Sequence, residues 1–141
     1  MASVGYWALK KKIHDVLKND TLLSGVQVEY GVRGLPVVQF PAVKIYSKSK
    51  SEEMRRVGGK AWDVTMDFVI ECWACDWESI ERSDEKLADL VDKVEQVLRK
   101  NEGLGGMVLE SGITEATFEE GKEEDVFISV ASLTFSVKLR A

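Results

Sequence analysis

Apolar and polar residues alternate strictly from Trp62 to Cys72. Every even position in this stretch is apolar, and the odd positions are polar or charged with the exception of Val69. Because successive side chains of a β-strand point to opposite faces, the pattern predicts a long strand with one buried face and one hydrated face. The same residues in a helix would not gather into an apolar stripe. We therefore expect an antiparallel sheet whose buried face is covered by other parts of the chain.

Two other segments have the periodicity of amphipathic helices. Ser3 is the expected N-cap of the first helix, which runs to about Asn19. The second helix follows Trp77, ends near Asn101 or Gly103, and is expected to cover the buried face of the central strand. The apolar residues that define these helices are Leu9, Ile13, Val16 and Leu17 in the first, and Ile80, Leu87, Leu90, Val91, Val94, Val97 and Leu98 in the second.

Four more strands complete the expected sheet. They run from Val26 to Tyr30, from Ala42 to Tyr46, from Met107 to Phe118 with a bulge at Gly112, and from Val126 to Leu139. The last strand begins with apolar residues on both faces, which predicts cover on both sides there. A hairpin between the second strand and the central strand is the simplest connection. The order α-β-β-β-α-β-β predicts an α+β fold with a mostly antiparallel, twisted sheet of four to five strands and two helices.

Composition indicates one globular domain over residues 1–141. Hydrophobic residues make up 45% of the chain and charged residues 30%, and no stretch approaches the roughly 18 apolar residues of a membrane span. The first residues lack the basic flank and apolar run of a secretion signal, so we expect an intracellular protein. The net charge is −5, which disfavours specific binding to nucleic acid.

Two segments carry strongly biased charge. The long basic loop expected between the second and third strands, Ser47 to Lys60, holds five basic residues and two acidic ones, and Glu119 to Asp125 holds five acidic residues and one lysine. They are either two hydrated loops or complementary patches that meet between copies in a head-to-tail ring. A tryptophan on the hydrated strand face, such as Trp73, either completes the edge of the core or marks a protein contact. The candidate interface residues are Lys48, Lys50, Arg55, Arg56, Lys60, Glu119, Glu120, Glu123, Glu124, Asp125 and Trp73.

No cluster of residues predicts catalysis or a cofactor. Cys72 and Cys75 have the spacing of a redox pair, but the acidic neighbours Asp76 and Glu78 would raise the thiol pKa, and strand alternation places Cys72 in the core. The single histidine, His14, has no second histidine to share a metal, so a surface or interface position is expected. We expect no enzyme activity, no cofactor and no metal site.

Three carboxylates share the hydrated face of the central strand. Asp63, Asp67 and Glu71 follow one another at intervals of four residues. They either bind a cation weakly or form an ordinary hydrated face, and the second reading needs no ligand.

The layout as a whole resembles the tail-terminator proteins (tail-completion, head–tail joining proteins) of long-tailed bacteriophages. The resemblance covers nearly the whole chain and rests on order and spacing of elements, because this family has no catalytic motif. The segments that carry it are the helix with Leu9, Ile13, Val16 and Leu17, the strand Phe40-Pro41-Ala42-Val43-Lys44-Ile45, the strand Trp62 to Ile70 after a long loop, the helix Leu87 to Leu98, and the closing strand from Phe127 to Val137.

The resemblance implies a structural function. Such proteins form a ring, usually of six copies, on the end of the tail tube, where they stop polymerisation and join the tail to the head. The implied partners are other copies of the chain, the tail tube protein and the head connector, and the implied location is the virion tail or the host cytoplasm during assembly. The alternatives are a thiol-disulfide protein based on Cys72 and Cys75, another head-completion or minor capsid protein, and a cytosolic adaptor.

Overall fold

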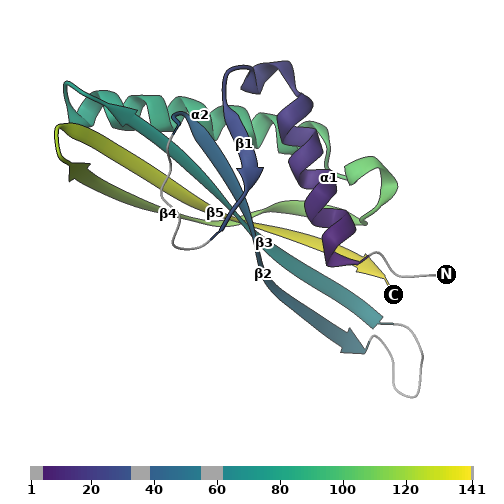
Figure 1. Ribbon diagram of the computed structural model, residues 1–141. Coiled ribbons are helices and arrows are strands. Elements are labelled where there is room, and N and C mark those ends of the chain that lie inside the picture. Colours follow the sequence, from purple (N-terminus) through teal and green to yellow (C-terminus); the bar gives the residue numbers. More distant parts are fainter. Residues whose placement is uncertain (1–4, 33–38, 55–61, 141) are drawn as a thin grey trace.

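The computed structural model describes residues 5–32, 39–54 and 62–140. It contains a five-stranded sheet with two long helices on one face (Figure 1). In chain order the elements are α1 (Tyr6–Asn19), a 3-10 turn (Thr21–Leu23), β1 (Gln27–Tyr30), β2 (Ala42–Met54), β3 (Trp62–Asp76), α2 (Ile80–Lys100), a second 3-10 turn (Leu104–Gly106), β4 (Glu110–Glu123) and β5 (Val126–Arg140). The predicted α+β class and the order α-β-β-β-α-β-β are confirmed.

The strands lie side by side in the order β1-β2-β3-β5-β4. Only β1 and β2 are parallel, and the other three pairs are antiparallel, including the expected hairpin of β2 and β3. The register places Ile45 of β2, Ile70 of β3 and Leu133 of β5 in one row across the sheet. The last strand in the chain therefore lies in the interior of the sheet, between β3 and β4.

The alternation of β3 produces the core. Val64, Met66, Phe68, Ile70 and Cys72 are all buried beneath the helices. Each large side chain of this kind contributes roughly 1.5–3 kcal/mol when it is removed from water. The buried residues of α1 are Leu9, Ile13 and Leu17, and the buried apolar residues of α2 are Leu87, Leu90, Val91, Val94, Val97 and Leu98. The predicted cover of the central strand by the second helix is confirmed.

A close contact lies next to β1 between a glycine and a buried tyrosine. Gly31 lies directly against the buried ring of Tyr46, and a Cβ added at residue 31 would come within 2.2 Å of a ring carbon. Glycine allows this approach because it has no side chain. Position 31 therefore has no room for a side chain.

The ends of several elements differ from the sequence prediction. The N-cap of α1 is Gly5, which makes no side-chain cap bond, so the prediction of a cap at Ser3 is wrong. The prediction of a loop from Ser47 onward is also wrong, because β2 continues to Met54 and pairs with β3 back to Trp62. In this part β2 is an edge strand beside β3, and β5 pairs with the other side of β3. We call residues 47–54 of β2 the arm; it has a bulge between Ser47 and Ser49.

Corrections are also needed in the second half of the chain. β3 extends to Asp76, beyond the predicted end at Cys72, and β4 begins at Glu110 rather than Met107. The irregularity of β4 lies between Ile113 and Glu115, not at Gly112. The start of β5 is not covered on both faces as predicted, because its apolar side chains at Val126, Phe127, Ile128 and Val130 are only half-buried.

Candidate protein interface

The two charged segments lie at opposite ends of the sheet. The arm lies along the half of β3 that ends where Asp63 pairs with Arg140. The turn between β4 and β5 lies at the other end, where Asp76 of β3 pairs with Phe127. Figure 1 shows the arm and the turn pointing away from each other. The segments therefore cannot pair within one chain.

The described part of the arm carries two exposed lysines. Lys48 lies at the bulge of β2, and Lys50 forms an ion pair of 3.1 Å with Glu52, an exposed pair of small energetic weight. The other predicted basic residues, Arg55, Arg56 and Lys60, lie outside the described residues. β1 pairs with β2 only as far as Ile45. Beyond that point, β3 is the only strand neighbour of the arm among the described residues.

The acidic segment is mostly strand rather than loop. Glu119 and Glu120 belong to β4, Glu123 ends it, and only Glu124 and Asp125 form the turn. All five carboxylates are exposed as the sequence predicts, but alternation divides those of the strand between its two faces. The full set therefore surrounds the end of the sheet instead of forming one patch.

Trp73 lies in a hollow with three of these acidic residues. The hollow has a volume of about 400 Å³ and is lined by Trp73, Glu119, Glu120, Gly121, Lys122, Glu123, Ile128 and Val130. We call this set the acidic hollow, and Trp73, Ile128 and Val130 form its apolar floor. The indole Nε1 of Trp73 donates a hydrogen bond of 3.1 Å to Glu71, which fixes the ring.

The structure thus unites residues that the sequence prediction treated separately. It also adds Ile128 and Val130, whose apolar character on the outward face of β5 was the available signal. A Cβ added at Gly121, which pairs with Ile128, would meet nothing within 4 Å, so the space above this part of the floor is open. The acidic hollow is suited to an apolar group with positive charge around it.

A second hollow lies beside the basic arm. It has a volume of about 420 Å³ and is bounded by the start of α1 on one side and by the arm on the other. Its residues are Tyr6, Trp7, Lys10, Ser47, Lys48, Ser49, Lys50, Met66, Asp67 and Phe68, and we call this set the basic hollow. The sequence prediction included its lysines at positions 48 and 50 but not Tyr6, Trp7 or Lys10, because only the fold brings α1 to the arm.

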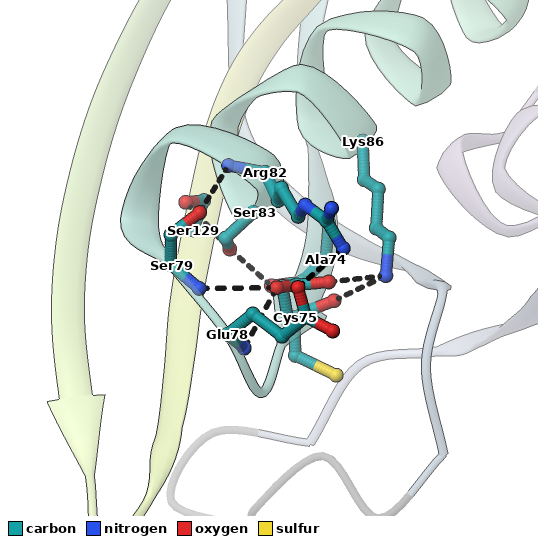
Figure 2. A network of polar contacts seen from close by, with 9 residues as sticks. Ala74, Cys75, Glu78, Ser79, Arg82, Ser83, Lys86 and Ser129 are labelled. Atoms are coloured by element: carbon teal, nitrogen blue, oxygen red, sulfur yellow. Dashed lines mark hydrogen bonds and ion pairs between the residues drawn. The ribbon is translucent and has the colours of Figure 1, made fainter.

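Buried hydroxyl groups connect the acidic end to α2. Ser83 donates a hydrogen bond of 2.9 Å to Ser129, which in turn donates one of 2.7 Å to the carboxylate of Asp84. Figure 2 shows Ser83 and Ser129 at this junction of α2 and β5. Glu120 lies close to the same carboxylate, and its hydrogen bond with Asp84, together with the negative charge of Asp84, raises the pKa of Glu120. The acidic end is therefore attached to the helix layer through side chains as well as backbone.

The first turn of α2 is closed by capping groups. Ser79 accepts a hydrogen bond from the main-chain N–H of Arg82, and Asp76 accepts bonds from the N–H groups of Glu78 and Ser79 (Figure 2). The ammonium of Lys86 donates a bond of 2.8 Å to Asp76. The bond from Lys86, followed by the main-chain bonds, lowers the pKa of Asp76 to about 2. This carboxylate serves the helix start and is an anion at neutral pH.

The placement of the two cysteines does not favour a redox pair. Both belong to β3, and strand alternation places their side chains on opposite faces. Both are free thiols. Burial raises the pKa of Cys72 to about 12, with further contributions from Glu95 and Glu71, and burial also raises the pKa of Cys75. Because the thiolate is the reactive species, the arrangement does not favour thiol-disulfide chemistry.

The carboxylates on the open face are held by neutral donors. Asp67 accepts hydrogen bonds from the hydroxyls of Ser49 and Ser136, at 3.3 and 2.5 Å, and Glu71 accepts the indole bond of Trp73. Over residues 5–32, 39–54 and 62–140, no group of three or more histidine, cysteine or acidic side chains is arranged to hold a metal ion. His14 lies on α1, as expected, stacked 4.4 Å from the ring of Tyr30.

Comparisons with known proteins show a shared fold. No protein-family model matches the chain, and no curated protein matches it in sequence. Among solved structures, the chain is similar to one from the "Virion of native gene transfer agent (GTA) particle", with a TM-score of 0.51 and 11% sequence identity. The match covers 94% of this chain and 95% of the other. In the part of the chain that the structure describes, neither helix is long and apolar enough to cross a bilayer.

Proposed function

We propose that this chain is a structural protein of a phage-like tailed particle. It would form a ring on the end of the tail tube, stop tube growth and join the tail to the head. The observation that carries the proposal is the fold match with a virion chain over nearly the full length of both proteins. The finer assignment to the tail end rests on the layout of elements that the chain shares with tail-terminator proteins. The proposal includes no catalytic activity.

The placement of charge supports association in a ring. A head-to-tail contact joins two different surfaces, and repetition of that contact closes into a ring when the rotation between copies allows it. The exposed lysines of the arm, Lys48 and Lys50, and the acidic hollow are such a pair, because they lie in opposite halves of one sheet and differ in charge. Exposed ion pairs contribute little individually, about 0–1 kcal/mol, so the apolar floor formed by Trp73, Ile128 and Val130 would supply much of the affinity.

The implied partners are other copies, the tail tube protein and the head connector. A net charge of −5 suits a ring through which DNA passes, because a basic lumen would retain the phosphate backbone. The particle tail, and the host cytoplasm during assembly, would be its locations.

Microscopy of particle assembly tests the function directly. In cells that assemble the particle, removal of this chain should give tubes of uncontrolled length and heads without tails. The purified chain should form rings at high concentration in negative-stain images. Tubes of normal length with attached heads in the absence of the chain would refute the proposal.

Charge reversal tests the head-to-tail contact. The variant Lys48→Glu/Lys50→Glu and the variant Glu119→Lys/Glu123→Lys should each fail to assemble alone, because each places like charges at the contact. An equimolar mixture should assemble again, because every contact in an alternating ring would then join opposite charges. Lys11→Glu/Lys18→Glu, two exposed lysines on α1, is the matched control and should assemble normally. Sedimentation velocity that is unaffected by either reversal, and by salt between roughly 0.05 and 0.5 M, would contradict the electrostatic contact.

A further inference from the structure

We propose that the basic hollow holds the β4–β5 turn of a neighbouring copy. This inference rests on the head-to-tail ring proposed above, and it identifies residues of α1 as part of the contact. None of the charged residues and Trp73 that the sequence predicts for the interface lies on α1, so the inference adds a new element to the contact.

The lining of the basic hollow is suited to an acidic ligand with an apolar part. Tyr6 and Trp7 form exposed aromatic walls, with 58% and 55% of their surfaces accessible, above a floor that includes the buried side chains of Met66 and Phe68. Three lysines surround this apolar surface, at positions 10, 48 and 50. The one acidic residue of the lining, Asp67, already accepts two hydroxyl hydrogen bonds. The hollow therefore presents net positive charge over aromatic surface.

The aromatic wall is held in position although it is exposed. The ring of Trp7 lies 5.3 Å from the ring of Tyr30, which is itself stacked on His14. Lys10 places its ammonium 6.0 Å from the centre of the same tyrosine ring. Exposed tryptophans with fixed positions are the side chains that most often dominate binding energy, because little conformational freedom is lost on association.

The ammonium of Lys10 also gains from an anionic partner. Partial burial lowers the pKa of Lys10, which means that its charge is incompletely hydrated in the free chain. A carboxylate that enters the hollow would compensate for that lost hydration. In this respect Lys10 differs from the exposed Lys11 beside it.

The β4–β5 turn has the complementary chemistry. Glu123, Glu124 and Asp125 are exposed at its tip, and the half-buried apolar residues Val126 and Phe127 follow immediately. The turn lies at the opposite end of the sheet from the basic hollow, so it can only reach the hollow of another copy. Lysines beside aromatic rings also suit single-stranded nucleic acid. The neighbouring copy is favoured because the chain itself carries the matching turn and because its overall charge repels a polyanion.

Matched variants of the full chain test the contact. Trp7→Ala and Lys10→Glu should each weaken assembly about tenfold or more in sedimentation velocity, because each removes a central part of the hollow. The controls are Trp77→Ala, which removes a tryptophan that is 70% exposed elsewhere, and Lys11→Glu, which reverses the exposed charge next to Lys10; both should stay within about twofold of the wild type. Trp7→Phe keeps an aromatic wall and should retain most of the affinity. Circular dichroism confirms that each variant is folded.

A reciprocal mixture identifies the occupant. Lys10→Glu/Lys48→Glu should recover assembly when it is mixed with Glu124→Lys/Asp125→Lys. Rings that form normally from Trp7→Ala and from Lys10→Glu would overturn this inference and leave the proposed function intact. A wild-type chain that never self-associates would overturn both. Binding of a single-stranded oligonucleotide that requires both Trp7 and Lys10 would overturn this inference in favour of nucleic acid.

Discussion

Removal of the Ser129 hydroxyl should destabilise the fold through a neighbouring residue. Ser83 and Ser129 are both fully buried, and the bonds run from Ser83 to Ser129 and from Ser129 to Asp84. In Ser129→Ala, the hydroxyl of Ser83 keeps only the main-chain carbonyl of Ala74, at 3.5 Å, as an acceptor. The carboxylate of Asp84 loses a donor at the same time. One substitution therefore weakens two hydrogen bonds.

The expected loss of stability follows from these contacts. A buried polar group left without a good partner costs about 1–3 kcal/mol, so we expect about 2 kcal/mol for Ser129→Ala. Ser83→Ala leaves the bond from Ser129 to Asp84 in place and should cost about 1 kcal/mol. The double variant removes both hydroxyls and leaves no buried donor unpaired. Its cost should therefore be about 2 kcal/mol, less than the sum of the single variants.

Urea denaturation followed by tryptophan fluorescence measures these values, and in thermal melts 1 kcal/mol corresponds to roughly 4 °C for a chain of this size. Ser132→Ala, on the open face of the same strand, is the control and should lie within about 0.5 kcal/mol of the wild type. Strict additivity of the two single variants, within about 0.3 kcal/mol, would refute the coupling. A stable Ser129→Ala protein would refute the reasoning as a whole.

Three further outcomes are expected. Gly31→Ala forces a Cβ into the aromatic ring packed against it and should cost about 1–3 kcal/mol in urea denaturation, whereas Gly121→Ala enters open space and should be close to neutral. In a Cys75→Ser background, Cys72 should react with a disulfide reagent at pH 8 only as fast as the protein unfolds, because its pKa of about 12 keeps the thiol protonated; rapid labelling of the native protein would contradict this. The pKa of Asp76 is about 2 in the folded protein and close to 4 in the unfolded chain, so its ionised form adds stability above about pH 4 that is lost as the pH falls towards 2. Melting curves of Asp76→Asn and wild type should therefore converge over this range, and a constant difference would contradict the assignment.

The elements that the sequence predicts best are those with a periodic apolar face. The alternation of β3 and the stripe of α2 are determined by burial on one side, so their type and mutual packing follow from the pattern alone. The arm was missed because its serines and lysines have no apolar face. Main-chain hydrogen bonds to β3 make that segment a strand, and no pattern of residue types predicts these bonds.

Part of the candidate interface could also be predicted from the sequence, because residue type and strand alternation identify outward-facing residues. Trp73 and the acidic segment were identified by residue type and strand alternation, and the structure brings Trp73 together with Glu119 and Glu123. The aromatic wall at Tyr6 and Trp7 could not be identified from the sequence, because some thirty residues or more separate α1 from the arm. Only the fold brings the helix and the arm together. Local pattern gives the elements, whereas neighbours across the fold depend on how the elements pack.

The interior position of β5 has a consequence for biosynthesis. It is the last of the described strands to leave the ribosome, yet it pairs with β3 on one side and β4 on the other. Until it emerges, β3 and β4 each present an unsatisfied edge, and the apolar row that ends in Leu133 is incomplete. Nascent chains at this stage have the unpaired edges and uncovered apolar surface that promote misassociation. Emergence of β5, rather than growth of the earlier strands, would therefore set the moment at which each newly made copy becomes competent to join another.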